Sequence, residues 1–149
     1  LGDVYKRQSK DYIFDMDRFV SFEGNTGPYI LYTIVRIKSI LARYQSQEEK
    51  YEGEAKILPA VSGSEKDLML QLSRYNEIME TSFTELAPHK ICQYIYELAN
   101  AFNRFYHETK IISEENKERQ ASWICLISLT KDVLNECIDV LGIEAPERM

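Results

Sequence analysis

The sequence predicts an all-α fold, a helical bundle of four main helices. Apolar residues recur at steps of three and four along four long stretches, and no alternating pattern of the β type persists. Glycine and proline residues separate these stretches. The 149 residues, 44% of them apolar and 28% charged, have the composition of one ordinary globular domain.

The first main helix is expected to begin near Pro28, because proline has no N–H to leave unpaired in a first turn, with Thr26 as its N-cap. We expect it to end near Tyr51, before Gly53. Its apolar positions follow helical spacing: Leu31, Val35, Ile37, Leu41 and Tyr44. Residues 53–63 are expected to form a loop.

Three further helices are expected along the rest of the chain. The second begins with Ser64 and Asp67 as a capping box, the third begins around Pro88, and the fourth is capped by Ser113 and ends before Gly142. The second helix carries Leu68, Leu72, Tyr75, Met79 and Phe83 on its apolar stripe. The third carries Ile91, Ile95, Leu98, Phe102 and Phe105, and the fourth Ile124, Ile127, Val133, Leu134, Cys137, Ile138 and Leu141.

Charge and cysteine usage exclude several classes of protein. With 18 basic and 24 acidic residues the net charge is -6, which argues against a strongly basic nucleic-acid binder. No stretch approaches the ~18 apolar residues of a membrane span, so we expect no membrane partner. Cys92, Cys125 and Cys137 lack paired spacing, which favours free thiols and a cytoplasmic location.

Motifs for catalysis or metal binding are weak. The Gly24–Gly27 run precedes a helix but lacks P-loop spacing, and it is either a phosphate-binding turn or a plain helix entry. His89 and Cys92 have the spacing of two zinc ligands on a helix, or they are a surface histidine beside a buried cysteine. No nucleophile lies beside a base. We therefore expect no catalytic residue and no metal site in this chain.

The first main helix has a charge unlike the rest of the chain. Residues 27–47 contain Arg36, Lys38 and Arg43 and no acidic residue, for a net charge of +3. Tyr29 and Tyr32 are interleaved with these cations, a combination that suits unstacked bases and phosphates. Alternatively, the tyrosines face the core, and Arg36 is solvated or pairs with an acidic residue of the fourth helix.

Several motifs resemble those of arginyl-tRNA synthetases. The most specific are the Glu-Gly-Asn-Thr-Gly-Pro-Tyr run at 23–29 and the Glu-Arg-Met run at 147–149. Further matching features, in the same order, are Phe14–Asp17, Tyr32, Arg36, Pro88-His89, Tyr94–Ala99, Phe105-Tyr106, Arg119 and Leu141–Glu144. The resemblance covers about residues 10–149 and is to the C-terminal, DALR-type anticodon-binding domain of the bacterial enzymes, with the end of the junction that precedes it.

The resemblance implies three segments. Residues 1–8, LGDVYKRQ, look like a translated sequencing-adapter fragment and are expected to be non-native. Residues 9–26 correspond to the junction from the catalytic domain, and 27–149 to the anticodon-binding helical domain. The family is an arginine-tRNA ligase family that uses ATP and Mg²⁺, and its two ATP-site signatures do not occur here. This chain is therefore not expected to catalyse alone, and we expect it to need no cofactor itself.

The resemblance also implies a binding site for the anticodon loop. The matching residues are Tyr29, Tyr32, Arg36, Tyr106 and Met149. The tyrosines can stack on splayed bases, and the arginine can bond a base edge or a phosphate. The implied partners are arginine tRNA isoacceptors and the absent catalytic domain, and we expect a monomer. The alternative is a helical protein-interaction module of the same fold without RNA function.

Overall fold

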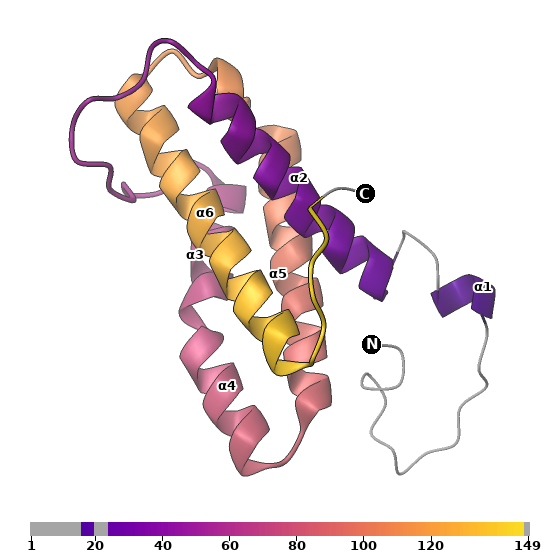
Figure 1. Ribbon diagram of the computed structural model, residues 1–149. Coiled ribbons are helices and arrows are strands. Elements are labelled where there is room, and N and C mark those ends of the chain that lie inside the picture. The colour runs from indigo at the N-terminus through magenta and orange to yellow at the C-terminus, as the bar shows by residue number, and fades with distance from the viewer. Residues whose placement is uncertain (1–15, 20–23, 148–149) are drawn as a thin grey trace.

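The computed structural model describes residues 16–19 and 24–147, which form an all-α bundle (Figure 1). No strand occurs in these ranges, and the predicted fold class is confirmed. The elements are α1 (Met16–Phe19), α2 (Gly27–Gln45), α3 (Gly63–Ser73), α4 (Tyr75–Thr84), α5 (Pro88–Glu108), the 3-10 turn η1 (Ile111–Ser113) and α6 (Lys117–Val140). Residues 1–8, most of the junction predicted at 9–26, and Met149 lie outside the described residues.

Two predicted helix termini are confirmed. Thr26 caps α2, and its Oγ1 accepts a hydrogen bond from the N–H of Tyr29 (3.4 Å), with Pro28 in the first turn. Gly142 follows the end of α6 with φ +74°, and its N–H donates to the carbonyl of Asp139 (2.8 Å). Glycine is favoured there because a side chain is strained at positive φ.

The predicted end of the first main helix was wrong. α2 ends at Gln45 instead of continuing to Tyr51. The Gln47 side-chain Nε2 donates to the carbonyl of Ile112 in η1 (2.8 Å), and this bond draws the chain off the helical path. The loop that follows therefore begins earlier than the predicted 53–63.

The predicted capping box of the second helix was also wrong. The cap of α3 is Ser62, whose Oγ accepts from the N–H of Glu65 (3.1 Å). Ser64 is instead buried inside the first turn. Asp67 faces α5, where its Oδ2 accepts from Arg104 Nη1 (3.0 Å). The cap lies two positions earlier than predicted because Glu65, three residues after Ser62, is the acidic residue of the first turn. Its N–H donates to Ser62, and its carboxylate is buried.

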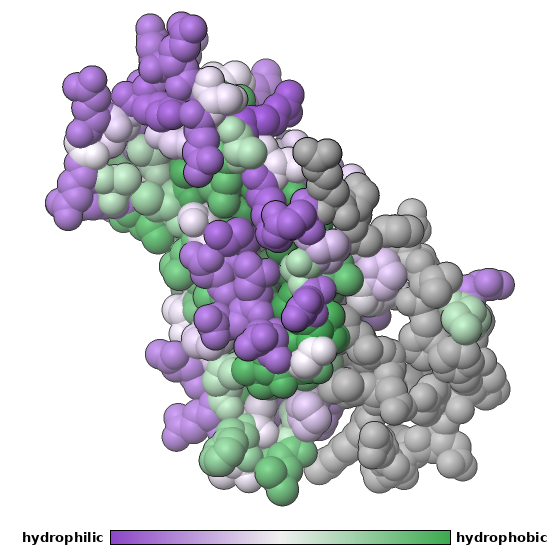
Figure 2. Space-filling model, viewed as in Figure 1, coloured by the Kyte–Doolittle hydropathy of each residue, from purple (hydrophilic) through white to green (hydrophobic). Residues whose placement is uncertain are grey.

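The second predicted helix is two helices, α3 and α4, separated at Arg74. The Arg74 guanidinium Nη1 donates to Glu97 Oε2 on α5 (3.0 Å), which ties the break to the neighbouring helix. Phe83, predicted on the apolar stripe, is 83% exposed, so its assignment to the core was wrong. With Leu86 it forms an apolar tip where α4 turns into α5, the green lower end of the bundle in Figure 2.

The start of the last helix was predicted too early. Asn116, not Ser113, caps α6, and its Oδ1 accepts from the N–H of Arg119 (3.0 Å). Ser113 belongs to η1. The 3-10 turn intervenes because Gln120 Nε2 donates to the carbonyl of Ile112 (2.9 Å) and holds that turn against α6.

The core is organised around α5, which packs against α2, α3, α4 and α6. Its predicted stripe is confirmed, since all five residues are at most 4% exposed: Ile91, Ile95, Leu98, Phe102 and Phe105. The core residues of α2 are not mainly the predicted stripe, since Leu31, Leu41 and Tyr44 are only partly buried, but a neighbouring set: Ile30, Ile34, Ile37 and Ile40. The apolar stripe of α6 is buried at Ile127, Leu134, Cys137 and Ile138 and only partly buried at Ile124, Val133 and Leu141.

A buried carboxylate joins the loop 46–62 to α3 and α6. Glu65 has no exposed surface, and its oxygens accept from Val61 N–H (2.9 Å) and Trp123 Nε1 (3.1 Å). The Arg119 guanidinium lies 3.7 Å from Glu65 Oε1 and donates to the carbonyl of Pro59 (2.9 Å). A buried charge must be paired and hydrogen-bonded, and these contacts meet that requirement.

Replacing Arg119 should destabilise the fold strongly. Arg119→Met leaves the buried Glu65 carboxylate without its cation, and we expect a loss of about 2–3 kcal/mol in the free energy of unfolding, measured by urea denaturation. The matched control is Arg104→Met, whose half-exposed pair with Asp67 should contribute less than about 1 kcal/mol. Equal effects of the two substitutions would contradict this role of the buried pair.

Two buried thiols should make stability fall at alkaline pH. Burial raises the pKa of Cys92 to about 11 and that of Cys137 to about 12. In the unfolded chain both ionise near pH ~8.5, so the unfolded state releases its protons first. The free energy of unfolding should therefore be insensitive to these groups below about pH 8 and decrease from about pH 9 upwards.

Urea unfolding across this pH range measures the effect. The Cys92→Ala/Cys137→Ala double variant should show a flatter pH dependence, whereas Cys125→Ala, at a partly exposed site, should keep the original one. A slope that is unchanged in the double variant would refute the assignment to these thiols.

Candidate nucleic-acid interface

Four of the five predicted site residues meet where α2 packs on α5. Tyr29, Tyr32 and Arg36 lie on successive turns of α2, and Tyr106 lies near the end of α5. The two helices run side by side, and this brings residues far apart in sequence together (Figure 1). Met149, the fifth, lies outside the described residues.

Arg36 is the centre of this group. Its Cζ lies 4.8 Å from the centroid of the Tyr32 ring and 5.6 Å from that of Tyr106, so one guanidinium contacts a ring from each helix. Its Nη1 donates to Oδ1 of Asn103 (2.6 Å). Among the described residues no carboxylate pairs with Arg36, so the fold leaves its positive charge uncompensated.

Asn103 holds the group in place, and it was not among the site residues predicted from the sequence. Its side chain is buried, and Nδ2 donates to the hydroxyl of Tyr29 (2.9 Å) and to Oγ1 of Thr33 (3.2 Å). The Tyr29 hydroxyl in turn donates to Oδ1 of Asn100 (2.7 Å). Since a guanidinium can only donate, Asn103 Oδ1 must face Arg36, and the orientation of the amide follows.

A signal for Asn103 was present in the sequence. Asn100 and Asn103 stand three apart among Ala99, Ala101 and Phe102, so two amides interrupt an otherwise apolar stretch. Buried amides require partners, and the spacing places both on one side of a helix. Their partners could not be named, because they lie on α2.

The three tyrosines of this group differ in how much of each ring is accessible to a ligand. Tyr29 is half-buried, packs edge-on against Tyr96 (centroids 5.9 Å apart) and has its hydroxyl bonded to two amides. Tyr106 is stacked on Phe102, with centroids 6.0 Å apart and planes 17° apart. Tyr32 is 41% exposed, which makes it the most accessible ring of the three.

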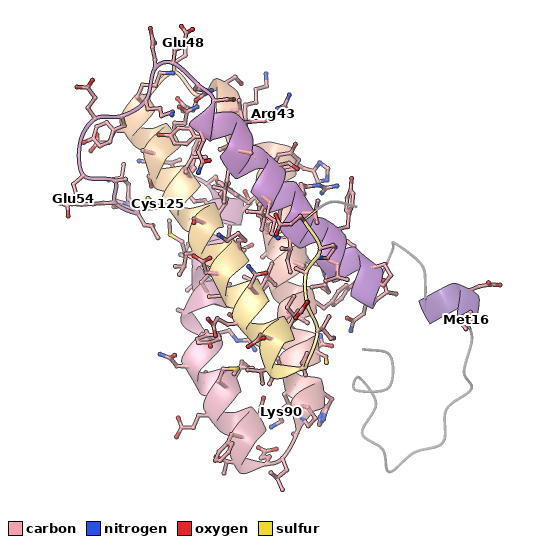
Figure 3. The ribbon with its side chains drawn as sticks, in the orientation of Figure 1. Met16, Arg43, Glu48, Glu54, Lys90 and Cys125 are labelled. Carbon is pink, nitrogen blue, oxygen red and sulfur yellow. The ribbon has the colours of Figure 1, made fainter. Side chains whose placement is uncertain are left out.

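The fold neutralises part of the positive charge that α2 carries in the sequence. Lys38 Nζ lies 2.7 Å from Glu147 Oε1, and this hydrogen bond lowers the pKa of the Glu147 carboxyl. Arg43 projects from the far end of α2 toward solvent (Figure 3) and has no acidic partner among the described residues. Within residues 24–147, Arg36 and Arg43 are therefore the cations of this helix that have no acidic partner.

Comparison with known proteins identifies the family. The model of the DALR anticodon binding domain matches residues 30–149. The chain belongs to this family. The arginine–tRNA ligase of Agathobacter rectalis is 60% identical to this chain over 149 residues, which cover 99% of this chain and 25% of that protein. The ligase of Alkaliphilus oremlandii is 58% identical over 148 residues, also 99% of this chain and 25% of that protein.

Solved structures agree with this assignment. The Plasmodium falciparum arginyl-tRNA synthetase matches with a TM-score of 0.80 and 27% identity, over 99% of this chain and 26% of that one. The Thermus thermophilus enzyme matches with a TM-score of 0.74 and 31% identity, over 87% of this chain and 22% of that one. The resemblance to arginyl-tRNA synthetases is thus confirmed, and the DALR chain spans about a quarter of the length of these relatives.

In residues 16–19 and 24–147 no group of three or more His, Cys, Asp or Glu side chains is placed to hold a metal ion. None of the helices in those ranges is long and apolar enough to cross a membrane. His89 and Cys92 lie in the first turns of α5, where Cys92 is fully buried.

Removing the Asn103 amide should destabilise the DALR domain. Asn103→Ala removes the amide that donates to the Tyr29 and Thr33 hydroxyls and accepts from the buried end of the Arg36 guanidinium, and we expect a loss of about 2 kcal/mol in unfolding free energy. Gln93→Ala, which removes an exposed amide of the same helix bonded to Glu97 (2.9 Å), is the control and should cost less than about 0.5 kcal/mol. Urea denaturation compares the two, and similar losses would show that Asn103 is not a structural hub.

Proposed function

We propose that this chain is the anticodon-binding domain of an arginine–tRNA ligase and that it binds the anticodon loop of arginine tRNAs. The observation that carries the proposal is the placement of Arg36, which has no carboxylate partner among the described residues and contacts the Tyr32 and Tyr106 rings. Membership of the DALR family supports the same function.

The chemistry of this group suits single-stranded RNA. Bases in a loop can leave their stack and lie on aromatic rings, which contributes about 1–3 kcal/mol per base. Tyr32 and Tyr106 provide such rings, one from each helix, in contact with a guanidinium that itself can stack. Asn103 accepts a hydrogen bond from Nη1 of Arg36. The other N–H donors of the Arg36 guanidinium can therefore bond a base edge or a phosphate. Tyr29 and Met149 are proposed as further contacts.

Net charge explains why such binding would be selective. The chain carries a net charge of -6, so it repels the phosphate backbone in general. Only a loop that places its bases on the tyrosines and a phosphate near Arg36 gains enough to offset that repulsion. Affinity then depends on a few base contacts instead of on total positive charge.

The remaining parts of the reaction are assigned to the rest of the parent enzyme. We infer that the parent attaches arginine to tRNA with ATP and Mg²⁺, and that its catalytic domain lies outside this chain, because the ATP-site signatures of the family do not occur in it. The contribution of this chain is to position the tRNA for that domain. We propose that the chain is monomeric and works in the cytoplasm.

Binding measurements with matched RNAs test the function. We expect the chain to bind an arginine tRNA more tightly than the same tRNA carrying the anticodon loop of an unrelated tRNA, in filter-binding titrations at fixed salt. Arg36→Met and Tyr106→Ala should each weaken binding to the arginine tRNA about tenfold, because each removes a contact worth roughly 1–2 kcal/mol.

Two control variants separate the site from the fold and the overall charge. Tyr106→Phe keeps the ring and should bind within about twofold of the unmodified chain. Arg104→Met removes a cation of the same helix that pairs with Asp67, and it should also bind normally. Equal affinity for both RNAs, unchanged by the Arg36 and Tyr106 variants, would reject RNA binding and favour the protein-interaction module.

A further inference from the structure

Hydrogen bonds between α2 and α5 form one series with a fixed direction. Arg36 Nη1 donates to Asn103 Oδ1 (2.6 Å), and Asn103 Nδ2 donates to the Tyr29 hydroxyl (2.9 Å). That hydroxyl donates in turn to Asn100 Oδ1 (2.7 Å). Because a guanidinium has no acceptor, the direction of the bond at Arg36 sets the direction of each bond that follows. The series therefore requires the carbonyl oxygen of Asn100 to face Tyr29.

Asn100 leaves the nitrogen of its amide available to a ligand. The residue is half-buried on α5, and its Nδ2 has no hydrogen-bond partner in the described part of the chain. The fold does not enclose this nitrogen. Since Oδ1 is held by the Tyr29 hydroxyl, the group that remains for a ligand is a pair of N–H donors whose position is fixed.

Both ends of this series of bonds are donors. At one end the Arg36 guanidinium is charged, and at the other the Asn100 amide is neutral. Arg36 lies seven residues after Tyr29, the partner of Asn100, so the two ends are separated by about 10 Å along α2. Each end can therefore contact a different nucleotide of a loop that lies along this helix.

We propose, on the basis of the function proposed above, that Asn100 is a specificity-determining residue whose Nδ2 donates to an acceptor atom of an anticodon-loop base. An asparagine that uses both ends of its amide reads the donor and acceptor pair of adenine. With Oδ1 held by Tyr29, Asn100 can only donate. It therefore favours a base that presents a ring nitrogen or a carbonyl oxygen and disfavours one that presents an amino group at that point.

A base suits this donor better than a phosphate does. A neutral amide gains no attraction between charges from a phosphate, and the net charge of -6 repels the RNA backbone. Bases that leave the stack of a single-stranded loop expose their edges to such side chains. The neutral end of the series is thus matched to a base edge.

Two other roles for Asn100 make different predictions. If Asn100 only orients the Tyr29 ring, removing its amide has no effect on RNA binding once the Tyr29 hydroxyl is absent. If Nδ2 donates to a phosphate or a ribose hydroxyl, removing the amide weakens the binding of an RNA whether or not its bases are present. A variant of Asn100, a variant of Tyr29 and RNAs that lack single bases therefore separate the three roles.

Asn100→Leu is the variant that tests the role. It keeps nearly the size of the side chain and removes the amide donors. In filter-binding titrations at fixed salt it should bind the arginine tRNA about fivefold more weakly than the unmodified chain, as expected for the loss of one hydrogen bond. A loss of about threefold or more should persist when Asn100→Leu is combined with Tyr29→Phe, because the bond to RNA does not require the Tyr29 hydroxyl.

Arginine tRNAs with one abasic nucleotide in the anticodon loop identify the contacted group. An abasic nucleotide keeps the ribose and the phosphate and lacks the base. At one loop position, Asn100→Leu and the unmodified chain should bind the abasic tRNA equally well, because the contact is already lost. At the other positions the fivefold difference should remain.

The matched control is Asn135→Leu. Asn135 is a half-buried amide of α6 that lines the shallow cavity beside Lys38, so its removal should leave every affinity within about twofold. Asn100→Ala provides a second variant without the donors, and alanine is well accepted in a helix. It should show the same dependence on the abasic position.

Three results would overturn the role of Asn100. The first is an Asn100→Leu affinity for the arginine tRNA that equals that of the unmodified chain. The second is a loss that disappears in the Tyr29→Phe chain, which would make Asn100 a support for the ring. The third is an equal loss for every RNA, abasic ones included, which would assign Nδ2 to the RNA backbone.

Failure of the proposed function would be recognised separately. If the unmodified chain did not distinguish the arginine tRNA from the same tRNA with an unrelated anticodon loop, anticodon recognition itself would be rejected, and the role of Asn100 with it. If the chain distinguished the two RNAs but gave one of the three results above, the function would stand and only the role of Asn100 would be rejected.

Discussion

The site depends on one buried amide that must satisfy its hydrogen bonds between two helices. Asn103 lies on the core side of α5, among side chains that are otherwise mostly apolar, and every polar atom of its amide is bonded to a residue of α2. This fixes the rotation of α2 about its own axis relative to α5, because only one rotation presents Tyr29, Thr33 and Arg36 together. The apolar stripes alone would tolerate small rotations, since packing of aliphatic side chains has little directionality.

That same amide lets the fold hold an arginine in place without neutralising it. A carboxylate at position 103 would fix the Arg36 guanidinium equally well but would cancel its charge. Elsewhere the described part of the chain uses carboxylates for this purpose, as in the Arg74–Glu97 and Arg104–Asp67 pairs. The neutral partner at Arg36 is therefore the feature that distinguishes the cation proposed to bind RNA from the structural ones.

The sequence was sufficient for the fold class and for the central helix, and insufficient where a terminus depends on a distant residue. The stripe of α5 is periodic, and all five residues predicted on it are buried. The cap of α3, in contrast, goes with the burial of Glu65, whose carboxylate accepts from Trp123 of the distant α6. The end of α2 likewise depends on the carbonyl of Ile112. In the site, composition and family resemblance named the aromatic and cationic residues, but Asn103 could be recognised only once α2 and α5 were packed together.

The contact between Glu65 and Trp123 has an optical consequence. Trp123 is the chain's single tryptophan, it is 7% exposed, its ring meets Phe105 edge-on (centroids 6.1 Å apart), and its indole N–H is bonded to a carboxylate. Its emission therefore comes from one dry, fixed environment at the joint of α3 and α6. Because the indole is not one of the rings around Arg36, tryptophan fluorescence follows the integrity of the scaffold, while the tyrosine signal contains the contribution of the rings around Arg36.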